Sequence, residues 1–196
     1  MPPPGDCGSP PRRQIGFSRM PVSSARVIVD TDATDRVGMA RIEGEIMIER
    51  PVDEVFDFVA DERNEPRYNP RMLSADLVSG EPIGSDSRFR AELKTGPRTR
   101  TMSMIIEFTD FERPRRLASL TYSSMMETTG ALTFEPQARG TLMRWSWDVR
   151  PRGPLHLLPP LVAQIGRRQE QRIWGNLKQL LESGVPISDP QSPTDH

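Results

Sequence analysis

The sequence predicts an α+β domain in which a seven-stranded antiparallel sheet is covered by a long helix at the C-terminal end of the chain. Three observations lead to this prediction. Apolar and polar residues alternate in short segments between residues 39 and 149, turn-forming residues separate these segments, and residues 159–183 carry apolar residues at three-to-four spacing. Alternation is typical of strands with one buried face, and the wider spacing is typical of an amphipathic helix.

The first strand begins after Met39, and Pro51 ends it. Its apolar face consists of Ile42, Gly44, Ile46 and Ile48. A short helix follows, with Asp53 as its expected capping acid and apolar residues through Val59. The next segment, residues 61–71, is charged and contains two prolines, which indicates a short irregular helix followed by a turn.

Six further segments have strand character, and turn-forming residues lie between them. Because short connections usually join neighbouring antiparallel strands, we expect these strands to form a meander. The predicted strands are residues 73–78, 87–94, 101–108, 117–123, 128–134 and 141–149. The long helix opens after Pro159-Pro160 and ends before Gly184, and its polar positions are Arg167, Arg168, Glu170 and Lys178.

The composition fits one domain, residues 39–183, between two tails. The chain has 196 residues, and one domain usually takes roughly 100–200 residues. Its 26 basic and 27 acidic side chains nearly cancel, so no long-range field favours nucleic acid as a partner. Cys7 is the only cysteine, which excludes an intrachain disulfide. We expect neither a metal nor a cofactor.

The two predicted tails are residues 1–38, which are rich in proline and arginine, and residues 184–196. The first stretch has too few apolar residues to offset its ordering entropy, so we expect it to be disordered. Met20 and Met39 are both plausible start sites, which leaves open whether residues 1–38 belong to the native product. The sequence contains no apolar run typical of a signal peptide or a spanning helix, so we expect a cytoplasmic protein without stable membrane insertion.

Several segments carry a resemblance to a known superfamily. Residues 46–56 run from a strand through a proline turn into a helix with Val55 and Phe56, and residues 84–89 contain Gly, Ser and Phe at a strand entrance. The other matching segments are Gly140-Thr141 and the helix residues Trp174, Leu177 and Leu180. With the element order, they resemble the SRPBCC superfamily, which includes START lipid-transfer domains, birch-pollen-allergen-like proteins and polyketide cyclase/dehydrase-like proteins.

The resemblance covers residues 40–183 and implies a helix-grip fold. In that fold the sheet is curved, the last helix packs over its concave face, and a cavity for a hydrophobic small molecule lies between them. One departure from the pattern is Tyr68, at a position where many relatives have a tryptophan beside the second helix.

The candidate ligand-binding residues are apolar residues that alternate toward the helix. Taken singly, each of them is more often part of a filled core, but the resemblance favours a pocket, and methionines adapt well to irregular ligands. The candidates are Phe89, Ala91, Met102, Met104, Ile106, Leu132, Phe134, Met143, Trp145 and Trp147 on the strands, and Ile165 and Ile173 on the helix. Leu93, Phe108 and Val149 share this face, and Met125 and Met126 are candidates for an entrance.

Few polar residues in the sequence are candidates for catalysis or for orienting a ligand. Tyr68 and Tyr122 are the candidates for a general acid, and Ser87, Thr128 and Thr141 are candidates for orienting a ligand carbonyl. His156 lies before the last helix, where an exposed loop histidine is expected rather than a base. Arg144 and Asp148 share one strand face, where they are expected to form an exposed ion pair.

Two functions fit these residues. The first is a binding or carrier protein for a hydrophobic metabolite such as a lipid, polyketide or aromatic compound. The second is a polyketide cyclase/dehydratase-type enzyme, in which Tyr68 or Tyr122 donates a proton within the same pocket. No convincing acid–base pair is apparent, which favours the first function. A third possibility, a protein-interaction module, is supported only by the arginines of the strands and the last helix.

Overall fold

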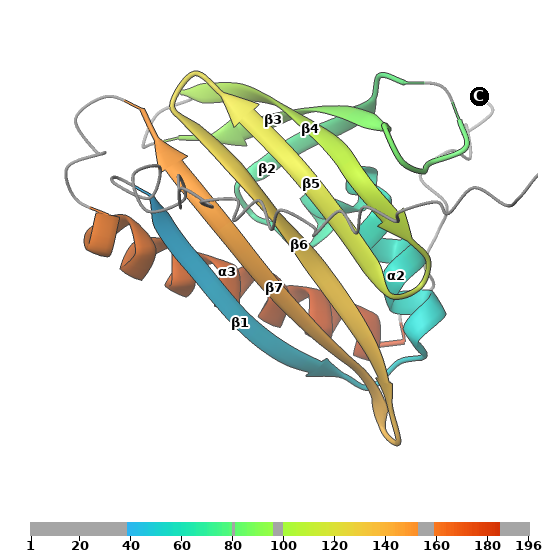
Figure 1. Ribbon diagram of the computed structural model, residues 1–196. Helices are drawn as coiled ribbons and strands as arrows, with labels where there is room; N and C mark the ends of the chain where they lie inside the picture. Colours follow the sequence, from blue (N-terminus) through green and yellow to red (C-terminus); the bar gives the residue numbers. More distant parts are fainter. Residues whose placement is uncertain (1–38, 80, 96–99, 153–158, 185–196) are drawn as a thin grey trace, which may run out of the picture. The chain divides into compact units, whose positions relative to one another are not determined.

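The computed structural model describes residues 39–79, 81–95, 100–152 and 159–184 (Figure 1). The elements follow the predicted order: β1 (Ala40–Ile48), α2 (Val52–Ala60), the 3-10 helix η1 (Glu62–Arg67), β2 (Met72–Leu77), β3 (Arg88–Lys94), β4 (Thr101–Glu112), β5 (Arg116–Ser123), β6 (Met126–Gln137), β7 (Gly140–Pro151) and α3 (Pro159–Glu182). The predicted α+β class is therefore confirmed. Residues 1–38 and 185–196, together with His156, lie outside the described residues.

The seven strands form one antiparallel sheet in the order β1-β7-β6-β5-β4-β3-β2. Strands β2 to β7 follow one another as the predicted meander, and β1 joins it beside β7. In that pairing Ile42 lies opposite Trp147, and Ile46 lies opposite Met143. Figure 1 shows α2 and α3 on the same side of the sheet, so its inner face is divided between these two helices.

Strand β4 is longer than the sequence pattern predicted, because its alternation changes phase. The pairing with β5 shifts between Phe108 and Asp110, which leaves one extra residue on β4 as a β-bulge. Before the bulge, even-numbered residues of β4 such as Ile106 and Phe108 face the core, whereas beyond it the odd-numbered Phe111 packs there. A strand predicted from strict alternation therefore ends at Phe108, although the observed strand continues to Glu112.

The core lies between the sheet and the two helices, and aromatic rings fill the part of it beneath α2. The ring of Phe56 on α2 packs edge-on against Phe111 and Phe134, with both centroid distances at 5.2 Å. Phe89 and Phe108 pack behind them with centroids 5.4 Å apart. Such pairs contribute about 0.5–1.5 kcal/mol each beyond their buried area.

The C-terminal end of α3 is tied to β1 and to the turn that follows it. Lys178 Nζ donates a hydrogen bond to the carbonyl of Met47 at 2.7 Å. The carboxylate of Glu182 accepts from the backbone amide of Glu49, also at 2.7 Å. Arg50 Nε donates to the carbonyl of Leu181 at 2.8 Å. These bonds fix the end of the helix over the sheet.

The burial of α3 differs between its two ends. Leu177 and Leu181 are 0% and 5% exposed, whereas Leu161 and Ile165, near the start of the helix, are 46% and 58% exposed. The apolar spacing of this helix therefore continues into a region that the sheet does not cover completely.

Two local predictions were wrong. Asp53 does not cap α2: the capping position is Pro51, without a side-chain cap, and Asp53 lies in the first turn, where it pairs with Arg113 at 3.1 Å. Arg144 and Asp148 do not pair with each other. Arg144 contacts Glu45 and Asp148 contacts Arg41, each at the directly opposite position of β1.

The strand geometry explains the second error. Residues four apart along a strand are separated by about 13 Å, whereas directly opposite residues on paired strands have Cβ atoms roughly 5 Å apart. For both side chains, the opposite residue on β1 is therefore closer than the residue four positions along β7.

Candidate ligand cavity

A cavity of about 400 Å³ lies between the sheet and residues 161–174 of α3. Strands β1 and β3 to β7 contribute to its floor, α3 forms one wall, and η1 with the turn that follows forms another. Its apolar lining consists of Ile42, Val59, Leu93, Met102, Met104, Ile106, Leu117, Met126, Leu132, Trp147, Val149, Leu161, Val162, Ile165, Ile173 and Trp174. Such a lining suits an apolar ligand, which loses its contact with water on binding.

The predicted ligand-binding residues fall into two groups. Those that line the cavity are Met102, Met104, Ile106, Leu132, Trp147, Ile165 and Ile173. Those that belong to the core and do not line it are Phe89, Ala91, Phe134, Met143 and Trp145. The second group is fully or almost fully buried and lies outside the cavity lining.

The two groups differ in whether a neighbouring helix or strand packs directly over them. Phe134 lies against Phe56 of α2, and the ring of Trp145 lies over Gly44 of β1. A Cβ atom on Gly44 would be 2.2 Å from Cζ2 of Trp145, which shows how closely the ring approaches the backbone. Strand alternation identifies the inner face of the sheet, but it does not tell which part of that face a helix covers.

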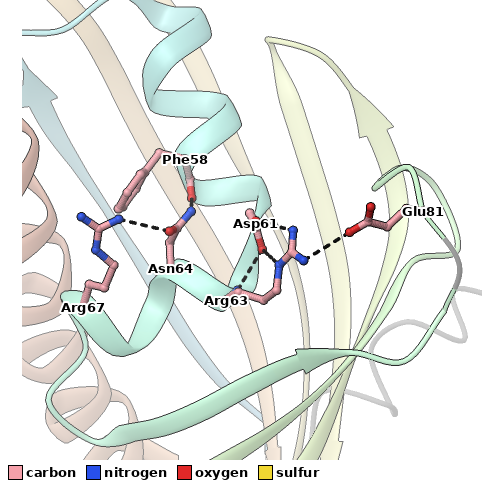
Figure 2. Close-up of polar contacts among 6 residues, drawn as sticks. All are labelled: Phe58, Asp61, Arg63, Asn64, Arg67 and Glu81. Carbon is pink, nitrogen blue, oxygen red and sulfur yellow. Dashed lines mark hydrogen bonds and ion pairs between the residues drawn. The ribbon is translucent and has the colours of Figure 1, made fainter. Parts of the chain in front are cut away.

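A hydrogen-bond network fixes η1 at the side of the cavity (Figure 2). The Asp61 carboxylate accepts from the backbone N–H of Arg63 at 3.1 Å and from its guanidinium at 2.8 Å, and that guanidinium also reaches Glu81 at 3.2 Å. Asn64 Nδ2, buried beneath the helix, donates to the carbonyl of Phe58 at 3.0 Å. The network holds η1 against the end of α2 and determines which of its side chains reach the cavity.

Two glutamates of η1 line the cavity as a hydrogen-bonded pair. Glu62 and Glu65 are three residues apart, so they lie on the same side of a helix with about three residues per turn. Burial raises the pKa of the Glu62 carboxyl well above its usual value, and the charge of Glu65 adds to this effect. Burial also raises the pKa of Glu65, against hydrogen bonds from Glu62 and Asn69 that lower it. A hydrogen bond between two carboxyl groups requires a proton on one of them, and the raised pKa values of both groups favour keeping it.

A third glutamate reaches the cavity from α3. Oε2 of Glu170 accepts hydrogen bonds from the indole N–H groups of Trp147 and Trp174, both at 3.0 Å. Burial raises the pKa of Glu170 to about 7; the charge of Glu65 raises it further, while the two indole bonds lower it. Glu170, which the sequence marked only as a polar position of the helix, therefore lines the cavity.

Tyr68 lies beside the three glutamates. The residue is 3% exposed, and its ring packs between Phe58 and Trp174 with centroid distances of 6.1 and 6.0 Å. Its side chain lines the cavity, and its hydroxyl has no hydrogen-bond partner among the described residues. Burial raises the phenol pKa well above its usual value, and the neighbouring carboxyl charges add to this. The hydroxyl therefore keeps its proton and faces the cavity as a donor.

The cavity also has a row of hydroxyl groups on its floor. Ser119, Thr121 and Ser123 alternate along β5, and Thr128 lies opposite Thr121 on β6. Ser123 Oγ is engaged with the backbone of Met126, at 3.1 and 3.2 Å. The hydroxyls of the other three residues make no side-chain hydrogen bond within the described part of the chain, so they are available to a ligand.

The remaining polar candidates lie elsewhere. Tyr122 is 37% exposed, lies outside the cavity lining and pairs with Ile105 across the sheet, so it is not placed to donate a proton there. Ser87 Oγ accepts from the Gly84 amide at 2.8 Å, and Thr141 Oγ1 donates to the Arg50 carbonyl at 2.8 Å. Both hydroxyls are structural.

The two entrance candidates also differ. Met126 lines the cavity, whereas Met125 is exposed and lies outside its lining.

The spacing of Glu170 in the sequence indicates that it is buried, whereas its charge suggests that it is exposed. Residue 170 precedes Ile173, Trp174 and Leu177 by three, four and seven positions, which places it on the buried stripe of α3. Glu62 and Glu65 carry a weaker signal, because their spacing aligns them only if the segment is a 3-10 helix. Charge is a good guide to exposure in general, but not beside a cavity.

Residues 39–79, 81–95, 100–152 and 159–184 contain no group of three or more histidine, cysteine, aspartate or glutamate side chains arranged to hold a metal ion. Within the same ranges, no helix combines the length and apolar character needed to cross a membrane.

Comparison with known proteins identifies relatives of almost the whole patterned region. Residues 39–182 match the family model described as polyketide cyclase / dehydrase and lipid transport. A Streptomyces halstedii protein named as a putative polyketide cyclase is 33% identical over 110 residues, which cover 53% of this chain and 94% of that protein.

Solved structures show the same fold at low sequence identity. A START superfamily protein from Mycobacterium smegmatis is 13% identical with a TM-score of 0.64, and the match covers 74% of this chain and 99% of that one. The Zhui aromatase/cyclase from Streptomyces sp. R1128 is also 13% identical, with a TM-score of 0.62 and coverage of 76% and 97%. These likenesses establish the helix-grip arrangement of the sheet and the last helix.

Proposed function

Since the chain belongs to the polyketide cyclase/dehydrase and lipid transport family, we propose that it is a binding or carrier protein for a hydrophobic small molecule. The observation that carries this proposal is the cavity between the sheet and α3. Its volume of about 400 Å³ lies within the range of roughly 300–1,000 Å³ that is usual for small-molecule sites. Lipids, polyketides and aromatic metabolites are the ligand classes that this lining suits.

The distribution of polar groups supports a ligand with both apolar and polar parts. Most of the lining is aliphatic, aromatic or methionine, whereas carboxyl and hydroxyl groups occupy limited parts of it. A few convergent polar groups in an apolar cavity typically orient a ligand, while the apolar area supplies affinity.

Native mass spectrometry of the full chain, before and after extraction with organic solvent, tests the proposal directly. We expect a co-purifying apolar mass that extraction removes. We also expect a neutral naphthalene probe to bind the extracted protein with increased fluorescence. Failure of both the native ligand and neutral apolar probes to bind would contradict the proposal.

Adjacent residues of β4 offer a matched pair of variants for this experiment. Met104 lines the cavity, whereas Ile105 is its neighbour on the opposite face of the strand. Met104→Trp should fill part of the cavity and weaken probe binding by at least about tenfold, the effect of losing roughly 1.4 kcal/mol. Ile105→Trp should leave binding unchanged. Equal effects of the two variants would indicate that the probe binds outside the cavity.

A polyketide cyclase/dehydratase-type reaction is the second candidate, and Tyr68 favours it. A dehydration removes a proton from the carbon beside a carbonyl and expels a hydroxyl from the next carbon as water, which needs a base and an acid. Glu170, with a pKa of about 7, can exchange a proton near neutral pH, and the Tyr68 hydroxyl remains protonated. These groups supply an acid–base pair that the sequence did not reveal.

The test of this second function is turnover of a synthetic aromatic β-hydroxyketone, followed by the absorbance of the conjugated enone. Tyr68→Phe retains the ring contacts with Phe58 and Trp174 and removes only the hydroxyl. If the enzyme reading is right, kcat should fall by at least about tenfold with little change in KM. Binding of the compound without enone formation would leave the carrier function as the sole explanation.

A further inference from the structure

The cavity wall carries an excess of acidic groups. Glu62, Glu65 and Glu170 all line it, and among the described residues Arg71 is the only basic one in the lining. The Arg71 guanidinium is already engaged: it donates to the Lys94 carbonyl at 3.0 and 3.2 Å and to Gln169 Oε1 at 2.7 Å. Both acceptors are uncharged, so Arg71 keeps its positive charge, but no basic side chain is among the groups that shift the pKa of these three carboxyl groups.

Such a cluster is costly in an empty protein. Carboxylates lose hydration when they are buried, and like charges that face one another repel. The protein lowers this cost by keeping a proton between Glu62 and Glu65 and by supplying indole donors to Glu170. A bound cation would relieve the same cost more completely, because it brings the missing opposite charge.

The groups around the cluster have free acceptors and aromatic faces. Both indole bonds to Glu170 reach Oε2, so Oε1 has no hydrogen-bond partner among the described residues. The rings of Trp147, Trp174 and Tyr68 also line the cavity here. Aromatic faces attract cations, with Trp the strongest of them. Tyr68 is nearly completely buried, and its unpartnered hydroxyl provides an independent polar contact for a ligand.

We propose that the ligand of this cavity is an apolar molecule that bears a protonated amine, with the ammonium group bound among Glu62, Glu65 and Glu170. This inference rests on the hydrophobic-ligand function proposed above and specifies its chemical class. The ammonium group donates hydrogen bonds to the free carboxylate oxygens, while the aromatic rings contact its positive charge. The hydrocarbon body lies along the aliphatic and methionine lining.

The carboxyl cluster makes this binding depend on pH. The titratable and charged groups that line the cavity with Glu170 are Glu62 and Glu65 of η1, Tyr68 after it and Arg71 directly before β2, and its hydrogen-bond donors are the uncharged indoles of Trp147 and Trp174. The carboxyl groups bind the cation in their ionised form, so amine affinity should rise as pH increases through about 7. Amine binding near this pH should also release protons to the buffer.

Three naphthalene probes with the same two-carbon framework test the proposal on the full chain. They are 2-(naphthalen-1-yl)ethylamine, which is cationic at pH 8, 2-(naphthalen-1-yl)ethanol, which is neutral, and naphthalene-1-acetate, which is anionic. Titration calorimetry at pH 8 should give an amine affinity at least about tenfold above that of the alcohol, with the acetate weakest, since hydrogen bonds to charged groups are the stronger ones.

The possible results separate the inference from the function on which it rests. Alcohol binding as tight as amine binding would overturn the amine inference and leave the hydrophobic-ligand function in place. Failure of all three probes would instead contradict the hydrophobic-ligand function, and the inference with it. The comparison uses unmodified protein, so it does not depend on whether any variant folds.

Two glutamate variants then assign the preference to the cluster. Glu170→Gln keeps an oxygen acceptor for both indoles and removes the charge, so it should reduce amine affinity by about tenfold without weakening the alcohol. Glu92→Gln makes the same change at an exposed position of β3 outside the cavity and should leave all three affinities unchanged. If both variants lost amine affinity equally, the preference for the amine would come from the overall charge of the protein and not from the carboxyl cluster. That result would overturn the proposal.

Discussion

Glu170 joins two elements of the cavity wall, α3 and β7, through one carboxyl group. It extends from α3, accepts the indole of Trp147 on β7 and accepts the indole of Trp174 one helical turn later. Oε2 of Glu170 therefore accepts two hydrogen bonds, but neither donor carries a positive charge. The pKa of Glu170 therefore remains raised, at about 7, because burial outweighs the effect of the two hydrogen bonds.

This raised pKa makes a prediction about stability. Between about pH 4.5 and 7 the folded protein retains a proton on Glu170 that the unfolded chain has released, so its contribution to the free energy of unfolding falls as pH rises. From pH 4.5 to 8 the loss should be at most about 3 kcal/mol. Glu170→Gln cannot ionise and should lack this component.

Urea unfolding of the two proteins at pH 4.5, 6 and 8 measures the effect. The free energy of unfolding of Glu170→Gln should increase relative to that of the original protein as pH rises. Parallel pH profiles would show that the Glu170 carboxyl has an ordinary pKa in the folded state. The comparison between proteins removes the contribution of carboxyl groups that do not interact with Glu170.

At the scale of elements, two glycines of α3 lie in different surroundings. A Cβ atom on Gly166 would be 2.2 Å from Cδ1 of Ile42, at the edge of the cavity, whereas a Cβ on Gly175 would have no heavy atom within 4 Å. Gly175→Ala should therefore stabilise the protein by about 0.5–1 kcal/mol through helix propensity. Gly166→Ala should gain less or lose stability, because Ile42 has to move.

Thermal and urea unfolding of both variants provide the measurement. Because each variant makes the same chemical change in the same helix, their difference isolates the contact with Ile42. An equal gain in both would show that the Ile42 side chain rotates away without cost.

The elements themselves were largely predictable from sequence, for identifiable reasons. Period-two patterns predicted every strand, because each strand has one face against the core, and the spacing of Ile173, Leu177 and Leu181 predicted α3. The strand ends were less predictable. The bulge after Phe108 changes the parity of β4, and the strands of the β6–β7 hairpin continue to Gln137 and from Gly140 as a paired ribbon beyond the predicted bounds.

The candidate site was less predictable than the elements. Met102, Met104 and Ile106 were predicted as lining because they alternate toward the helix, and they do line the cavity. The same rule selected Phe134 and Trp145, which are covered by α2 and packed against β1. The acidic cluster escaped prediction because its three members come from two segments that only the tertiary fold brings together. Local pattern does not contain that information.

At the scale of the whole molecule, the predicted START-like resemblance is confirmed by the family match and by solved structures with the same fold. The family match covers residues 39–182, and β1 at its beginning pairs with β7 near its end. The sheet is therefore complete only when both ends of this region are present.

We propose that residues 39–183 form an independently folding domain, and a fragment of residues 39–184 tests this. All strand pairings of the described residues, and the bonds that tie α3 to β1, lie within the fragment. Its Tm should be within about 4 °C of the full chain, the shift that roughly 1 kcal/mol produces at this size. A decrease of more than 10 °C, or failure to unfold cooperatively, would show that outside residues contribute to the domain.

The unequal attachment of α3 also has a consequence for kinetics. The tied end at Lys178 and Glu182 can open only with the sheet, whereas the end that carries Leu161 and Ile165 has less apolar surface to lose on lifting. Amide hydrogens near residue 165 should thus exchange through local opening, and those near residue 177 through global unfolding. A ligand would then leave at a rate set by the first half of one helix, so residence time and thermal stability can be altered independently in this molecule.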